Sequence, residues 1–236
     1  MSPSRYATIP VAEDGSGARP GAVRSPIRLP GWWVLLVPVV MVLVGAWVYR
    51  WVDEDAFINF RIIDNLAAGH GLVFNVGERV EVDSDPLWLF MLAGLHEALP
   101  FVALEWLSVL LGMACTGAGF VAGGEAVRRL GRSRREGAVF PLGLLMAAAV
   151  AGVWEFATSG LEMSMVFLWL GGSFLLLVRV EARAGSPVRA AFVMGLGMLI
   201  RPELALGSVV FLAGLLVVVS EPDRPTQGGP VDSVWW

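Results

Sequence analysis

Lysine is absent from this chain of 236 residues, and charge of either sign is scarce. All seventeen basic residues are arginine, and charged residues make up 16% of the chain, against roughly 25% in a typical soluble domain. The net charge is −4, and the arginines lie in short loops beside apolar segments. Membrane topology explains such arginines better than nucleic-acid binding does, so nucleic acid is not expected as a partner.

Cysteine is also nearly absent. The single Cys115 excludes an intrachain disulfide and a cysteine-based metal site. What the chain does have is apolar sequence: 56% of its residues are hydrophobic and its mean hydropathy is +0.68. Glycines and short charged loops interrupt the apolar runs, which favours helical spans over barrel strands. The sequence therefore predicts an all-α integral membrane protein, a polytopic helical bundle.

We expect about five membrane spans from the lengths of the apolar runs. They cover residues 31–49, 103–127, 138–156, 163–178 and 190–219. The last run holds Arg201-Pro202-Glu203 in its middle and is too long for one upright span. It is either one kinked span or two half-helices, and the proline favours a break near residue 202.

The arginines predict the orientation of these spans. Residues 1–30 carry several arginines and are expected to form a disordered cytoplasmic tail, and the arginine cluster at 128–135 is also expected in the cytoplasm. The sequence therefore predicts a multi-pass protein of the plasma membrane whose first loop, residues 50–100, lies outside the cell. Residues 31–219 form the membrane domain, and 220–236 are interpreted as a polar, truncated tail.

The first outer loop has structure of its own. Apolar residues recur at every third or fourth position from 56 to 67, which predicts a helix lying along the membrane surface. Pro86 begins a second segment, 87–99, that is too short to span and is expected to be another juxtamembrane helix. Between them, residues 72–82 look like a short extended hairpin.

Several motifs of the chain resemble one family, the polytopic C-type (GT-C) glycosyltransferases, and most of all the actinobacterial terminal β-(1→2)-arabinofuranosyltransferases. The motifs are Asp55-Ala56-Phe57-Ile58-Asn59-Phe60-Arg61, the run from Asn65 to Glu81, Pro86-Leu87-Trp88, Ser159-Gly160-Leu161-Glu162 and Arg201-Pro202-Glu203. Members usually have paired aspartates before Ala-Phe-Ile, where this chain has Glu54-Asp55. They are also longer, so the chain is expected to correspond to their N-terminal part.

The resemblance implies an enzyme and its substrates. The donor would be a sugar, arabinofuranose, carried on a polyprenyl phosphate, and the acceptor a cell-wall polysaccharide at the outer face, with membrane lipid around the protein. The sequence requires no cofactor. A divalent cation could bind Glu54 and Asp55, since carboxylates are hard oxygen ligands.

The acceptor hydroxyl must be activated, which a carboxylate can do, and Asp55 is the first candidate because it matches the family's acid nearest Ala-Phe-Ile. Glu54 is the second. Either could accept the proton of the acceptor hydroxyl or stabilise an oxocarbenium centre. The alternative is that these acids only favour a helix start, and this role is expected for Asp53.

The leaving phosphate needs positive charge, for which Arg61 and Arg201 are candidates. Arg61 could instead pair with Asp64 or Asn65 one turn away. An arginine within an apolar run needs partners, and Glu162 and Glu203 are the candidates. His70 is a further substrate-binding candidate, although its position between two glycines is typical of a turn.

Two other functions remain open at this point. The chain could be a catalytically inactive membrane fragment or subunit that binds lipid or a partner protein. It could also be a transporter, because a broken helix with intramembrane charge is typical of transporters.

Overall fold

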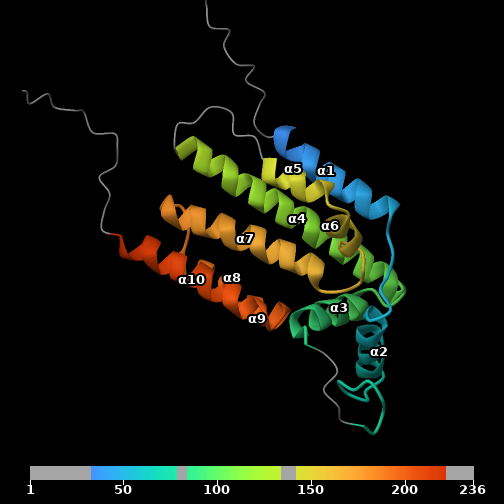
Figure 1. The fold of residues 1–236 in the computed structure, drawn as a ribbon. Coiled ribbons are helices and arrows are strands. Elements are labelled where there is room, and N and C mark those ends of the chain that lie inside the picture. The colour runs from blue at the N-terminus through green and yellow to red at the C-terminus, as the bar shows by residue number, and fades with distance from the viewer. Residues whose placement is uncertain (1–32, 79–83, 134–141, 222–236) are drawn as a thin grey trace, which may run out of the picture.

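The computed structural model describes residues 33–78, 84–133 and 142–221. Within these ranges the chain is helical and has no strand, in agreement with the all-α prediction. The helices are α1 (Trp33–Val48), α2 (Ala56–Ala67), α3 (Pro86–Ala98), α4 (Leu104–Ser133), α5 (Leu142–Ala149), α6 (Ala151–Phe156), α7 (Met163–Glu181), α8 (Pro187–Gly195), α9 (Gly197–Ile200) and α10 (Leu204–Ser220). The longer helices lie side by side, and α2 and α3 lie at one end of the bundle (Figure 1).

Helix α4 is the central element, and α1 packs against it in the opposite direction. Gly124, near the end of α4, faces Leu35 at the start of α1, whereas Gly117 faces Leu43. The short helices α5 and α6 then run alongside α1, where a Cβ at Gly45 would lie 2.9 Å from the Trp154 ring. This segment corresponds to the predicted span 138–156, but it is divided at Val150, whose backbone is extended.

Helices α4 and α7 run in the same direction and approach each other very closely. A Cβ at Gly171 would lie 2.9 Å from the carbonyl carbon of Gly119 and 3.1 Å from its Cα. Gly112 meets the backbone of Ala157 in the same way. Small residues at such a crossing allow two backbones to touch, which is the usual way in which helices associate in a membrane.

The last apolar run, 190–219, is not one kinked span but two separate helical segments, so the structure shows the alternative of two half-helices. Helix α9 ends at Ile200 and α10 begins at Leu204, so the predicted break near Pro202 is confirmed. However, α10 turns back and packs along α8 and α9. Ala190 and Leu215 belong to one buried cluster, which shows that the start of α8 lies beside the end of α10. Arg201 and Pro202 therefore lie in a turn at the end of the bundle and not inside a continuous span.

Two helices are long and apolar enough to cross a membrane: Leu104–Gly131 within α4, and Met163–Glu181, which is α7. The other apolar helices described are shorter, namely Leu35–Val48, Pro187–Ile200 and Leu204–Ser220. The sequence predicts about five spans. Among the described residues, two helices have the length and apolar composition of a full span.

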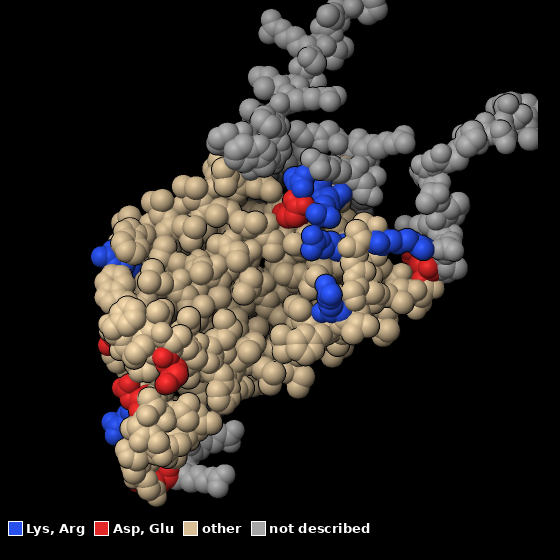
Figure 2. Space-filling view, turned by 180° about the vertical axis from the view of Figure 1, so that it is seen from behind, with Lys and Arg blue, Asp and Glu red and all other residues tan. Residues whose placement is uncertain are grey.

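Charge is divided between the two ends of the bundle. Most of the described arginines gather at the end away from α2 and α3, and most of the described acidic residues lie at the opposite end (Figure 2). The described arginines at the first end include Arg128, Arg129, Arg179, Arg183 and Arg189. Glu125 pairs with two of them, Arg128 at 2.6 Å and Arg129 at 2.7 Å.

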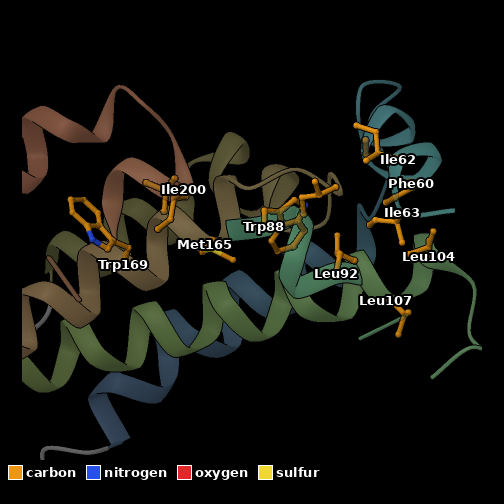
Figure 3. Close-up of a cluster of buried hydrophobic side chains, with 13 residues drawn as sticks. Phe60, Ile62, Ile63, Trp88, Leu92, Leu104, Leu107, Met165, Trp169 and Ile200 are labelled. Atoms are coloured by element: carbon orange, nitrogen blue, oxygen red, sulfur yellow. The ribbon is translucent and has the colours of Figure 1, made fainter. Parts of the chain in front are cut away.

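The first loop is attached to the bundle by a buried apolar cluster. Figure 3 shows Phe60 and Ile63 of α2, Trp88 and Leu92 of α3 and Leu104 of α4 among its members. The apolar stripe predicted for α2 is buried as far as Ile63, but Ala67 is exposed. The predicted hairpin at 72–82 is wrong for residues 72–78, which form turns and bends, and 79–83 lie outside the described residues.

Candidate active site

The three acids before α2 have different environments. Asp53 uses its side chain locally, because its Oδ1 accepts a hydrogen bond from the backbone N–H of Asp55 (3.0 Å). This agrees with the prediction that Asp53 is a helix-start residue. Asp55 occupies the N-cap position of α2, but its carboxylate makes no capping hydrogen bond. Glu54 and Asp55 are both exposed. The two candidate acids are therefore open to solvent, and the carboxylate of Asp55 is not used to cap the helix.

The loop between α6 and α7 packs directly against these acids. The backbone N–H of Asp53 donates to the carbonyl of Ser159 (2.8 Å). Gly160 lies against α2, where an added Cβ would be 2.8 Å from the Cβ of Ala56, and its φ of +82° favours glycine. The structure thus places Ser159-Gly160-Leu161-Glu162 beside the acidic triplet, about a hundred residues away in sequence, at one end of the bundle.

Glu162 and Arg201 come together at this end. The Nε of Arg201 lies 3.1 Å from Glu162 Oε1 and 3.6 Å from Glu203 Oε2. The pairing of Arg201 with these two acids was predicted and is confirmed. The Glu162 side chain is 11% exposed and that of Glu203 is 73% exposed, so Glu162 is the partner less screened by solvent. Arg201 and Glu203 also line a hollow of about 270 Å³.

Arg61 has a different partner from those expected. Its Nε donates to the carbonyl of Phe74 (2.8 Å) and its Nη2 donates to Asn75 Oδ1 (3.0 Å). The guanidinium also lies 4.7 Å from the centre of the Phe74 ring. The alternative pairing with Asp64 or Asn65 is not what the structure shows. Arg61 holds the loop that follows α2, which leaves fewer donors for a phosphate.

His70 lies in a turn, as its neighbours suggested. Gly69 and Gly71 have φ values of +80° and +85°, a conformation that few residues other than glycine adopt. The His70 side chain is exposed, and its backbone N–H donates to the carbonyl of Asn65 (2.9 Å). The structure does not bring His70 together with Arg201 in any interaction of the described residues.

Three residues with central positions, Asn59, Asp85 and Trp88, were not among the site residues predicted from the sequence, although Asn59 and Trp88 lie within its motifs. Asp85, at the start of α3, is 6% exposed, and its Oδ2 accepts a hydrogen bond from Asn59 Nδ2 (3.2 Å). Trp88 is fully buried and donates its indole N–H to the carbonyl of Gly160 (2.9 Å). An Asp-Pro pair signals a helix start, but no sequence pattern indicated that this carboxylate is buried.

The described residues contain no group of three His, Cys, Asp or Glu side chains arranged to hold a metal ion. Glu54 and Asp55 could supply two oxygen ligands to a divalent cation, and any further ligands would have to come from substrate or solvent.

Two curated proteins are similar in sequence to most of this chain. A protein of Mycobacterium tuberculosis is 35% identical over 205 residues, which are 81% of this chain and 32% of the relative. A protein of Corynebacterium glutamicum is 30% identical over 198 residues, 75% of this chain and 28% of the relative. Both are named terminal β-(1→2)-arabinofuranosyltransferase. The chain is close to this arabinofuranosyltransferase family.

The resemblance read from the motifs is therefore confirmed by relatives that match over most of the chain. The chain spans about a third of the length of these arabinofuranosyltransferases. No protein-family model matches the chain, and no solved structure is significantly similar to it.

Proposed function

We propose that this chain forms the part of a membrane arabinofuranosyltransferase that carries its outer-face carboxylates. The similarity to two relatives with this name carries the proposal, since it covers at least three quarters of the chain. The donor would be arabinofuranose on a polyprenyl phosphate, and the acceptor a cell-wall polysaccharide. The contact between Asp53 and Ser159 supports a single site made from segments far apart in the sequence.

In the proposed reaction Asp55 acts on the acceptor or on the sugar. Its exposed carboxylate could take the proton of the attacking hydroxyl or stabilise positive charge at the anomeric carbon. Glu54 is its neighbour and second candidate. If transfer retains the configuration of the sugar, a single displacement assisted by a general base is not sufficient, and a carboxylate would then have a nucleophilic or ion-stabilising role.

Arg201 is the better candidate for the leaving phosphate. Its side chain is 40% exposed and lines a hollow together with Met163, Val166 and Leu204. Glu162 holds its Nε and Met163 Sδ accepts a hydrogen bond from its Nη1 (3.0 Å), which orients the guanidinium so that its Nη2 can donate to phosphate oxygens. Arg61 would act mainly by fixing the loop after α2, since its Nε and Nη2 already have partners.

We further propose that the protein crosses the plasma membrane several times, with its N-terminus and its arginine-rich end in the cytoplasm. The division of charge in Figure 2 supports this orientation, because arginines accumulate on the cytoplasmic side of membrane proteins. Helices α8–α9 and α10 would then enter from the cytoplasmic side and return to it, so that the turn at Arg201 faces outward.

Cysteine labelling tests this topology in a Cys115→Ala background. An impermeant thiol reagent added to intact cells should label Glu97→Cys and Pro202→Cys, and should label Arg183→Cys only after the membrane is opened. Labelling of position 202 only from the inside would refute the proposed hairpin.

A transfer assay tests the activity. Membranes that contain the chain would be supplied with polyprenyl-phosphoryl arabinofuranose and a synthetic arabinan acceptor. Replacement Asp55→Asn should reduce transfer by roughly a hundredfold or more, the scale on which a general acid or base contributes. Glu97→Gln removes an exposed acid of α3 and serves as the matched control.

Two results would count against the proposal. Equal transfer by wild type and Asp55→Asn would exclude the assigned carboxylate. No transfer by the wild-type chain would favour the alternative of an inactive membrane fragment or subunit.

A further inference from the structure

A second hollow, of about 360 Å³, lies beside α2. Helix α2 contributes Phe57, Phe60, Arg61 and Asp64, and α3 contributes His96. The opposite wall, residues 100–105, is the turn between α3 and α4 together with the first residues of α4. Figure 3 shows Phe60 and Leu104 together in the buried cluster beneath it. We call this hollow the α2–α4 cleft.

Aromatic rings and polar groups share the lining of the α2–α4 cleft. Phe57 is 50% exposed and Phe101 is 83% exposed, so both present ring surface that the fold does not cover. The Nδ1 atom of His96 is buried and has no hydrogen-bond partner among the described residues. A buried polar atom without a partner is costly, and a flip of the imidazole ring, which lines the cleft, would bring this nitrogen within reach of a ligand hydroxyl.

The charges of the α2–α4 cleft disfavour an anion. Its only described cation is Arg61, whose Nε and Nη2 are engaged by Phe74 and Asn75. Asp64 and Glu105 contribute two carboxylates. One guanidinium and two carboxylates leave net negative charge, which repels phosphate but accepts hydrogen bonds from hydroxyl groups.

We propose that the α2–α4 cleft binds a neutral sugar ring, whose apolar face packs on Phe101 and whose hydroxyls hydrogen-bond to His96 Nδ1, Asp64 and Glu105. The sugar is identified as part of the acceptor glycan on the strength of the proposed function. The donor phosphate would then bind on the Arg201 side, so that the two substrates approach the acids at the start of α2 from different surfaces.

The experiment measures binding directly, with the full chain in detergent micelles. The first probe is a neutral synthetic arabinofuranosyl disaccharide, and the second is a short-chain polyprenyl-phosphoryl arabinofuranose. Saturation-transfer NMR would follow the sugar protons of each. The variants are Phe101→Ala and His96→Ala, and the control is Phe192→Ala, which removes an aromatic side chain of α8 that is 68% exposed and far from the cleft.

The disaccharide should bind to the wild type and to Phe192→Ala alike. Phe101→Ala should weaken its binding roughly fivefold, as expected for the loss of one ring contact, and His96→Ala by a similar factor for one hydrogen bond. Because Phe101 is almost fully exposed, its truncation should not disturb folding. Binding of the disaccharide that is unchanged in both variants, or binding of the phosphorylated probe alone, would overturn the proposal.

The outcomes also separate this inference from the proposed function. If the chain binds the disaccharide in the α2–α4 cleft but transfers no sugar, the result supports the proposed cleft and contradicts the proposed activity. If the wild type and Phe101→Ala both transfer sugar with the same KM for the acceptor, the result supports the proposed activity and contradicts the proposed cleft.

Discussion

The contact between α4 and α7 should make one glycine far more sensitive to substitution than its neighbour in the sequence. In Gly171→Ala the new Cβ would lie 2.9 Å from the carbonyl carbon of Gly119. The Gly119 carbonyl belongs to a helix backbone, and the new Cβ is attached directly to the backbone of α7, so the strain can be relieved only if the two helices move apart. At Gly172 an added Cβ meets no atom within 4 Å.

The magnitude follows from two opposing effects. Overpacking a well-packed contact costs about 1–3 kcal/mol, and backbone atoms that cannot turn aside place this contact at the upper end. Alanine favours the helix over glycine by about 1 kcal/mol. We therefore expect Gly171→Ala to lower the free energy of unfolding by about 2 kcal/mol and Gly172→Ala to raise it by up to about 1 kcal/mol.

Reversible unfolding in mixed micelles, followed by circular dichroism, would measure both variants. The two residues are adjacent in one helix and the substitution is the same. The two variants therefore share the same depth in the micelle and the same change in helix propensity. Equal stability of the two variants would refute the close backbone approach of α4 and α7.

Three further predictions concern the end of the bundle that carries the acids. A double-mutant cycle of Glu162→Gln and Arg201→Gln should give a coupling free energy of about 1–2 kcal/mol, between the values for exposed and buried pairs; a coupling near zero at low salt would show that the 3.1 Å pair does not form. Trp88→Phe should destabilise the fold by about 2–4 kcal/mol, because it leaves a small cavity and a buried Gly160 carbonyl without its donor; denaturant unfolding that matches the wild type would contradict this. Asp85→Asn should reduce stability measurably, since the amide replaces an acceptor of Asn59 by a group that can also donate; a thermal scan showing no change would argue against the buried pair.

Several elements of the fold could be predicted because they depend on local sequence. Pro86 begins α3 since proline fits the first turn of a helix. The break near Pro202 was expected because proline cannot continue the hydrogen-bond ladder. The all-α class follows from apolar runs that a membrane accepts only as helices or closed barrels.

The hairpin at 187–220 could not be predicted in the same way. A proline between two apolar segments is compatible with a kink, with half-helices in line or with a reversal. The choice depends on packing, here of α10 along α8 and α9, with Ala190 and Leu215 in one buried cluster. For the same reason the sequence located Arg201 within an apolar run, whereas the structure locates it in a turn beside Glu162.

The sequence by itself determined the membrane class, the approximate helices and the motifs shared with the arabinofuranosyltransferases, because these depend on composition, periodicity and residue identity. Only the tertiary structure decided which acids are available and which arginine has which partner. It separated Asp53 from Asp55, assigned Arg61 to the loop at Phe74 and buried Asp85 against Asn59. Each of these outcomes depends on contacts between side chains and neighbouring backbone or other elements, which helix propensity and hydropathy do not specify.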